Sequence, residues 1–120
     1  MPKIQTTAQR RRRYEIIARA EGEQCLICYI ENGRRVGPPR RRLVIEHADN
    51  DETNWNWDNL HLVCYSHNAR LKGLPVHEKI VKLHAYGDQL ERERKRENLP
   101  TWADVLKEGL PYEDGSPEMR

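Results

Sequence analysis

Apolar residues recur along this chain at two spacings, and each spacing predicts a different kind of element. Over residues 8–22 they fall on one face of a helix, and Gly22 predicts where that helix ends. Residues 43–47 (LVIEH) and 60–65 (LHLVCY) are short runs of aliphatic and β-branched residues, which predict two strands. A polar loop separates the two runs, so we expect the strands to fold back on each other as an antiparallel pair.

The second half of the chain predicts three helices. A short helix follows the second strand from about residue 66 and ends at Gly73, and Pro75 can open a longer helix that reaches about residue 98. Thr101 begins a sequence typical of a capping box, which predicts a final short helix. Earlier in the chain, residues 29–42 contain Asn-Gly and Gly-Pro-Pro and predict a loop.

These elements predict an α+β fold in one small domain of 120 residues. The expected parts are a basic N-terminal helix, a core with both strands, a C-terminal helical extension and an acidic, disordered tail, over residues 1–22, 23–75, 76–110 and 111–120. Hydrophobic residues make up only 37% of the chain and Phe is absent. A core built from so little apolar material is thin, and small thin cores usually need a staple such as a metal ion.

Cysteine usage points to the same kind of staple. Three cysteines cannot close into disulfides without leaving one over. The sequence shows neither the apolar stretch of a signal peptide nor an apolar run near the ~18 residues that a membrane helix needs. We therefore expect a reducing, cytoplasmic setting, no membrane association, and cysteines that bind metal.

The net charge of +2 hides a strong asymmetry along the chain. Residues 1–45 hold 11 Lys and Arg against four Asp and Glu, whereas residues 46–75 hold two against five. A basic front and an acidic centre suit a protein that grips a polyanion and gathers acidic ligands in one place.

Two ligand pairs, Cys25-x2-Cys28 and Cys64-x2-His67, stand 35 residues apart. A gap of two residues lets both side chains of a pair point at one centre, and four such ligands suit tetrahedral zinc. The four residues together predict a closed structural zinc site. Because a closed site leaves no position for water, this ion is not expected to do chemistry.

A second polar group is expected near the first one. Glu46 and His47 end the first predicted strand, and Asn68 lies in the first turn of the helix after the second strand. A strand–loop–strand–helix unit can bring a carboxylate, an imidazole and an amide oxygen into one cleft. Hard oxygen ligands suit Mg²⁺ or Mn²⁺, and a neutral imidazole beside such an ion can take a proton from water. These groups suit phosphodiester hydrolysis.

At these residues the sequence resembles the HNH endonucleases, also called His-Me finger or ββα-metal nucleases. The family pattern runs CxxC, Asp-His, Asn-Leu before a strand, then CxxC followed by His or Asn. The matching segments here are Cys25 to Cys28, EH at 46–47, DNLHLVC at 58–64 and CYSHN at 64–68, within residues 20–75. The final Asn makes the sequence similar to the HNN variant. The resemblance implies a small ββα-metal domain with a zinc knuckle, flanked by helices at both ends.

The resemblance also implies a role for each motif residue. His47 would be the general base, and Glu46 and Asn68 would hold the catalytic Mg²⁺ or Mn²⁺. Asn59 would pin the loop and orient His47 through hydrogen bonds. Two positions depart from the family pattern, because Glu46 replaces an Asp and His67 replaces the fourth knuckle Cys. Another assignment makes His67 the catalytic ligand and leaves a knuckle of three cysteines.

The expected function is a metal-dependent DNA endonuclease that uses one catalytic ion, in the cytoplasm of a bacterium or a phage-infected cell. Arginine donates paired hydrogen bonds to phosphate, so basic residues near the motifs are expected to contact DNA. These are Arg10, Arg11, Arg12, Arg13, Arg34, Arg35, Arg40, Arg41, Arg42, Arg70 and Lys72. Trp55 and Trp57 are expected to pack over the sheet, and His61 is expected to be exposed.

Two other functions remain open. One is a catalytically silent, zinc-stapled protein that binds DNA or acts as an adaptor in a phage or mobile-element complex. The other is an accessory role in which the acidic tail and the long predicted helix dock on a larger protein partner, and a homodimer is also compatible with the sequence.

Overall fold

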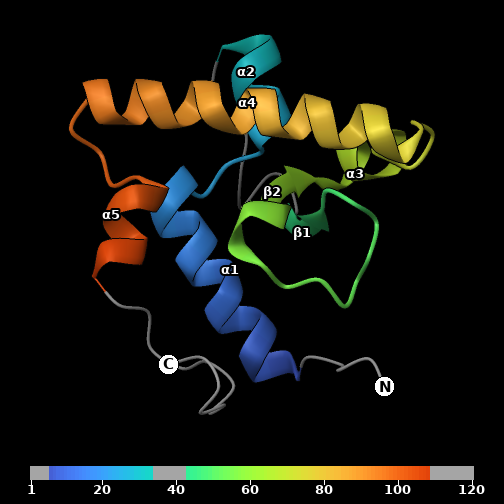
Figure 1. Ribbon diagram of the computed structural model, residues 1–120, viewed down its shortest axis with the longest axis horizontal. Coiled ribbons are helices and arrows are strands. Elements are labelled where there is room, and N and C mark those ends of the chain that lie inside the picture. The colour runs from blue at the N-terminus through green and yellow to red at the C-terminus, as the bar shows by residue number, and fades with distance from the viewer. Residues whose placement is uncertain (1–5, 34–42, 109–120) are drawn as a thin grey trace.

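The protein folds into a small α+β domain with one two-stranded sheet, seen in a computed structural model that describes residues 6–33 and 43–108 (Figure 1). The elements in chain order are α1 (Thr7–Glu21), α2 (Leu26–Asn32), β1 (Leu43–His47), the 3-10 turn η1 (Trp57–Asn59), β2 (Leu60–Cys64), α3 (Tyr65–Leu71), α4 (Val76–Arg96) and α5 (Trp102–Lys107). The predicted fold class is confirmed at this level.

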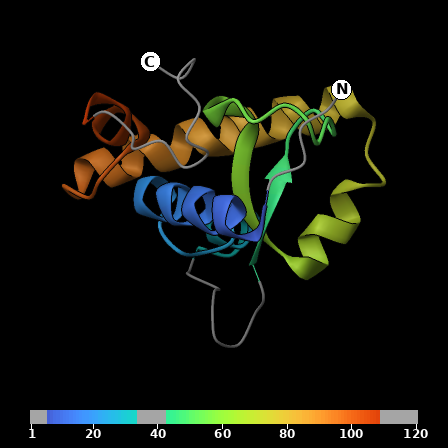
Figure 2. The ribbon, with the colours of Figure 1, turned by 90° about the horizontal axis from the view of Figure 1, so that it is seen from below.

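The two predicted strands are confirmed and pair in antiparallel fashion. Leu43 lies opposite Cys64 at one end of the sheet, and His47 lies opposite Leu60 at the other end. Every residue of β2 is buried, because α1 and α2 pack against this strand and α3 lies against both strands. The long helix α4 extends across the molecule and packs on α1 and α2 (Figures 1 and 2).

Local sequence signals explain where the predicted helices begin and end. Thr6 caps α1, and Thr101 caps α5 through the expected capping box with Asp104. Gly22 ends α1 at φ 88°, and a Cβ there would come within 2.9 Å of the Arg94 side chain. Glycine is therefore required at this turn by both the backbone angle and the space.

Helix α2 was not predicted, and part of the loop expected over residues 29–42 is therefore wrong. Cys25 caps α2 by accepting a hydrogen bond from Cys28 N at 3.4 Å, and Gly33 ends it in the left-handed region. Seven residues make too few turns for a periodic pattern to emerge in the sequence. The rest of that loop and the predicted acidic tail lie outside the described residues.

Two polar residues that were predicted to be exposed are buried instead. His61 is 5% exposed, because its strand is covered on both faces. Arg13 is 3% exposed, lies over the rings of Trp55 and Trp57 at 4.9 and 4.8 Å, and donates a hydrogen bond to Trp55 O at 3.0 Å. The predicted contact between Arg13 and DNA does not fit this position, since the guanidinium serves to pack the tryptophans.

The other predicted basic residues differ in how much the structure says of them. Exposed side chains are found at Arg10, Arg11, Arg12, Arg70 and Lys72. Outside the described residues lie Arg34, Arg35, Arg40, Arg41 and Arg42. No helix in the described ranges is both long and apolar enough to cross a membrane.

Candidate metal centre

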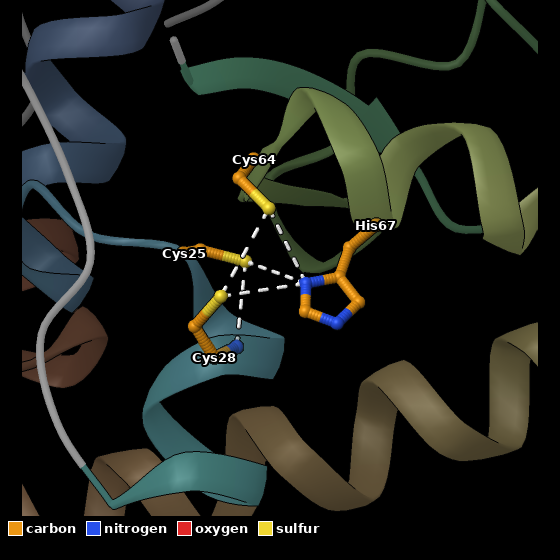
Figure 3. Close-up of side chains that lie close together, drawn as sticks. All are labelled: Cys25, Cys28, Cys64 and His67. Carbon is orange, nitrogen blue, oxygen red and sulfur yellow. Dashed lines mark hydrogen bonds between the residues drawn. The ribbon is translucent and has the colours of Figure 1, made fainter. Parts of the chain in front are cut away.

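Three thiols and one imidazole converge where α2, β2 and α3 meet (Figure 3). Cys25 and Cys28 come from the start of α2, Cys64 ends β2, and His67 lies in the first turn of α3. All four ligand atoms lie within 4.8 Å of one another, and the three cysteines are buried. The predicted grouping of Cys25, Cys28, Cys64 and His67 is confirmed.

Four distances within this Cys3His cluster are close to those around a tetrahedral zinc ion. Zinc–sulfur bonds of about 2.3 Å and zinc–nitrogen bonds of about 2.0 Å give edges of about 3.8 Å between sulfurs and about 3.5 Å between sulfur and nitrogen. Cys28 Sγ lies 3.9 Å from Cys64 Sγ, and His67 Nδ1 lies 3.6, 3.4 and 3.3 Å from the sulfurs of Cys25, Cys28 and Cys64. The cluster is compatible with a zinc site.

Burial favours the neutral, protonated form of the thiols in the cluster. Desolvation raises the pKa of the Cys25 thiol. At Cys28, desolvation and the neighbouring thiols of Cys25 and Cys64 raise the pKa to about 12. Thiolates are the form that binds metal, and a divalent ion supplies the positive charge that stabilises them.

The carboxylate of Glu46 already has a cation beside it. Lys79 is fully buried in the first turn of α4, and its Nζ lies 3.1 Å from Glu46 Oε1 and also donates to Asn50 Oδ1. His47 N donates to the same Glu46 oxygen at 3.0 Å. Glu46 Oε2 is buried and has no hydrogen-bond partner among the described residues. Of the two carboxylate oxygens, Oε2 is thus the one left for a further ligand.

His47 is enclosed at the end of β1. Its side chain is nearly buried, and its ring meets that of Trp55 edge-on, with centroids 4.6 Å apart and planes at 87°. Burial lowers the pKa of His47, even though Glu52 and Asp49 favour the charged form. Nε2 is buried without a hydrogen-bond partner within the described part of the chain.

Asn59 fixes the loop that follows His47. Its Oδ1 accepts from Asp49 N at 3.1 Å, its Nδ2 donates to Asp49 Oδ1 and to Asn54 O at 3.0 Å each, and its backbone carbonyl accepts from Ala48 N at 2.9 Å. Burial by itself raises the pKa of Asp49, but hydrogen bonds from Asn54, Asp51 N and Asn59 outweigh it and lower the pKa. Asn59 thus acts on the backbone beside His47 and not on the imidazole itself.

Asn68 lies half-buried in the first turn of α3, directly after His67. Among the described residues, only the Cys3His cluster gathers three or more Cys, His, Asp or Glu ligand atoms, and neither Glu46 nor His47 belongs to it. The predicted joint role of Glu46 and Asn68 in holding an ion stays a prediction.

Protein families, curated proteins and solved structures contain no match to this chain. The resemblance to the HNH endonucleases therefore depends on the motif residues alone.

The sequence did not single out Lys79, although a signal was present. Lys79, Leu83, Leu90 and Arg94 are the buried residues of α4 and recur at helical spacing. A lysine on an otherwise apolar face indicates a buried partner, and a carboxylate in a strand such as Glu46 is the natural candidate.

Proposed function

We propose that the protein is a metal-dependent DNA endonuclease in which a zinc ion supports the fold and His47 activates water. The observation that carries the proposal is the enclosed imidazole of His47, whose pKa is lowered by burial, at one end of a sheet whose other end holds the Cys3His cluster. A histidine that acts as a general base must be unprotonated at the working pH, and it must be held in place.

Zinc would be held by Cys25, Cys28, Cys64 and His67. Because these residues come from the start of α2, the end of β2 and the first turn of α3, the ion would fasten α2 and α3 to the end of β2. All four tetrahedral positions are filled by protein, so this zinc would supply stability and no chemistry.

A catalytic Mg²⁺ or Mn²⁺ would be held by Glu46 and Asn68, and would stabilise charge on the phosphate. Glu46 Oε2 is the atom we assign to the ion or to one of its waters, because Oε1 is engaged by Lys79 and by His47 N. His47 would accept the proton of the attacking water at Nδ1, since Nε2 is enclosed. Asn59 would keep the loop after His47 in place.

DNA would be held by the exposed basic residues near the site. Arg70 and Lys72 follow Asn68 along the chain, and Arg10, Arg11 and Arg12 lie on the exposed side of α1. Contacts of this kind release counterions, so we expect DNA affinity to fall steeply as salt rises.

Cleavage of supercoiled plasmid by wild type, His47→Ala and His77→Ala tests the proposal. His77 is an exposed histidine of α4, so its substitution controls for the loss of an imidazole elsewhere. With Mg²⁺ or Mn²⁺ we expect wild type and His77→Ala to cut alike, and His47→Ala to cut at least about 100-fold more slowly. All three should hold about one zinc per chain. Equal cleavage by zinc-loaded His47→Ala would rule out its role as base.

One observation favours the second function, a silent DNA-binding or adaptor protein. Lys79 provides Glu46 with a cation from the protein itself, which competes with a metal ion for the carboxylate. On this reading, all three proteins bind DNA with the same salt dependence and none of them cuts with either metal. A larger partner or a second copy would then be needed for activity, and co-purification would reveal it.

A further inference from the structure

A cavity of about 330 Å³ opens between the end of α1, β2, α4 and α5, away from the Cys3His cluster and His47. Its floor is formed by Glu21 and His61, and its walls include Trp57, Trp102 and Asp88. The volume is at the lower end of the ~300–1,000 Å³ range of small-molecule sites. None of the residues that the proposed nuclease function uses is among the described residues that line it.

The floor has two polar atoms that the protein leaves without partners. Glu21 and His61 are only 3% and 5% exposed. Glu21 Oε2 lies 2.8 Å from His61 Nδ1 and also accepts from Trp102 Nε1 at 2.8 Å. Glu21 Oε1 and His61 Nε2, by contrast, are buried and have no partner among the described residues. Because a buried polar atom without a hydrogen bond is costly, these two atoms point to a ligand.

The charged residues that line the cavity indicate which charge the ligand carries. Four carboxylates line the cavity, from Glu21, Asp58, Asp88 and Glu91, and its described lining includes no Lys or Arg. Glu91 is partly used, because it accepts from Trp102 N at 3.0 Å and so holds the start of α5. The remaining carboxylates leave an excess of negative charge, which favours a cation.

The two tryptophans that line the cavity indicate which kind of cation fits it. The rings of Trp57 and Trp102 lie 5.7 Å apart at an angle of 42°, and both residues line the cavity. Cationic groups bind well over indole faces, and a planar guanidinium also stacks on them.

We propose that this cavity binds a small organic cation, with a guanidinium or ammonium group on a short carbon chain. The head group donates to Glu21 Oε1 at the floor, the carbon chain packs against Trp57 and Trp102, and Asp88 adds charge at the side. Gly87 supports this arrangement, because a Cβ there would lie 3.1 Å from His61 Cε1 and would press on the floor. Recognition of this kind is independent of nuclease activity.

Titration of the full chain with butylguanidinium, followed by nuclear magnetic resonance of the three indole N–H groups, tests the proposal. The N–H of Trp102 hydrogen-bonds to Glu21 and should shift with saturation, whereas that of Trp55, which does not line the cavity, should stay in place. Butylurea has nearly the same shape without the charge, and we expect it to bind at least about tenfold more weakly.

Two substitutions on α4 complete the test. Asp88→Asn removes a carboxylate that lines the cavity, and Glu78→Gln removes an exposed one that does not. We expect Asp88→Asn to weaken butylguanidinium binding about two- to fivefold, as for one exposed charge pair, and Glu78→Gln to leave it unchanged. Equal shifts with butylurea, equal shifts at Trp55, or no saturable shift at Trp102 would each overturn the proposal.

Discussion

Buried polar groups lie at both ends of the sheet, and the cation that balances them comes from a different source at each end. At the end where Leu43 faces Cys64, the Cys3His cluster gathers three thiols and an imidazole, and the set includes no Lys or Arg. At the other end, Glu46 has the ammonium of Lys79 3.1 Å away. The Cys3His end is suited to bind a cation from solution, whereas at the Glu46 end the protein supplies the cation through Lys79. Metal dependence of the fold should therefore be confined to the Cys3His end.

The largest expected effect is loss of the fold when the cluster loses a ligand. Cys25→Ser should unfold the chain at 25 °C, because structural zinc contributes on the order of 10 kcal/mol, as much as the total stability of a small domain. Circular dichroism and zinc content measure this, and Ser66→Ala, an exposed change within α3, is the control. A Cys25→Ser protein that is folded and free of zinc would show that the cluster does not need an ion.

A smaller effect is expected at the other end, where the charges are both supplied by protein. Lys79→Met leaves the buried Glu46 without its cation, which should lower the free energy of unfolding by about 3–5 kcal/mol. Glu46→Gln in the same chain removes the unpaired charge and should restore most of the loss.

Chemical denaturation of the two single variants and the double variant measures the coupling between Lys79 and Glu46. Lys82→Met is a matched control on the same helix, because Lys82 pairs with Glu31 at 3.3 Å with both side chains partly exposed. Its cost should stay below about 1 kcal/mol. If the effects of Lys79→Met and Glu46→Gln simply add, the two residues do not form a charge pair.

The sequence predicted the features that depend on local patterns, and it missed those that depend on contacts between residues far apart in the chain. The strands and the Cys3His cluster depend on local patterns: β-branched runs, and ligand pairs separated by two residues. The Lys79–Glu46 pair and the burial of Arg13 depend on contacts between residues 33 and 42 positions apart, which no local pattern encodes. Helix α2 was missed for a different reason, since it is shorter than two full periods of its own pattern.

The smallest expected effect on stability is at His61. This residue tests the comparison directly, because raising the pH removes its positive charge. Burial by itself lowers the pKa of His61, but the charge and the hydrogen bond of Glu21 outweigh it, so the pKa is raised above its usual value. The pair thus contributes stability that is fully present below about pH 6.5 and is lost as pH rises through the folded pKa. Once His61 loses its proton, Glu21 loses the cationic partner 2.8 Å away.

Chemical denaturation of wild type and His61→Gln between pH 6 and 9 measures this contribution. Glutamine can still donate a hydrogen bond to Glu21 but has no proton to lose, so the difference in unfolding free energy between the two proteins isolates the charge. That difference should shrink with rising pH, at no more than about 1.4 kcal/mol per pH unit for one proton. A difference that stays constant or grows would mean that His61 is neutral in the folded protein. The Glu21–His61 pair would then resemble the Cys3His cluster, as a buried group of ligands that needs a cation from solution.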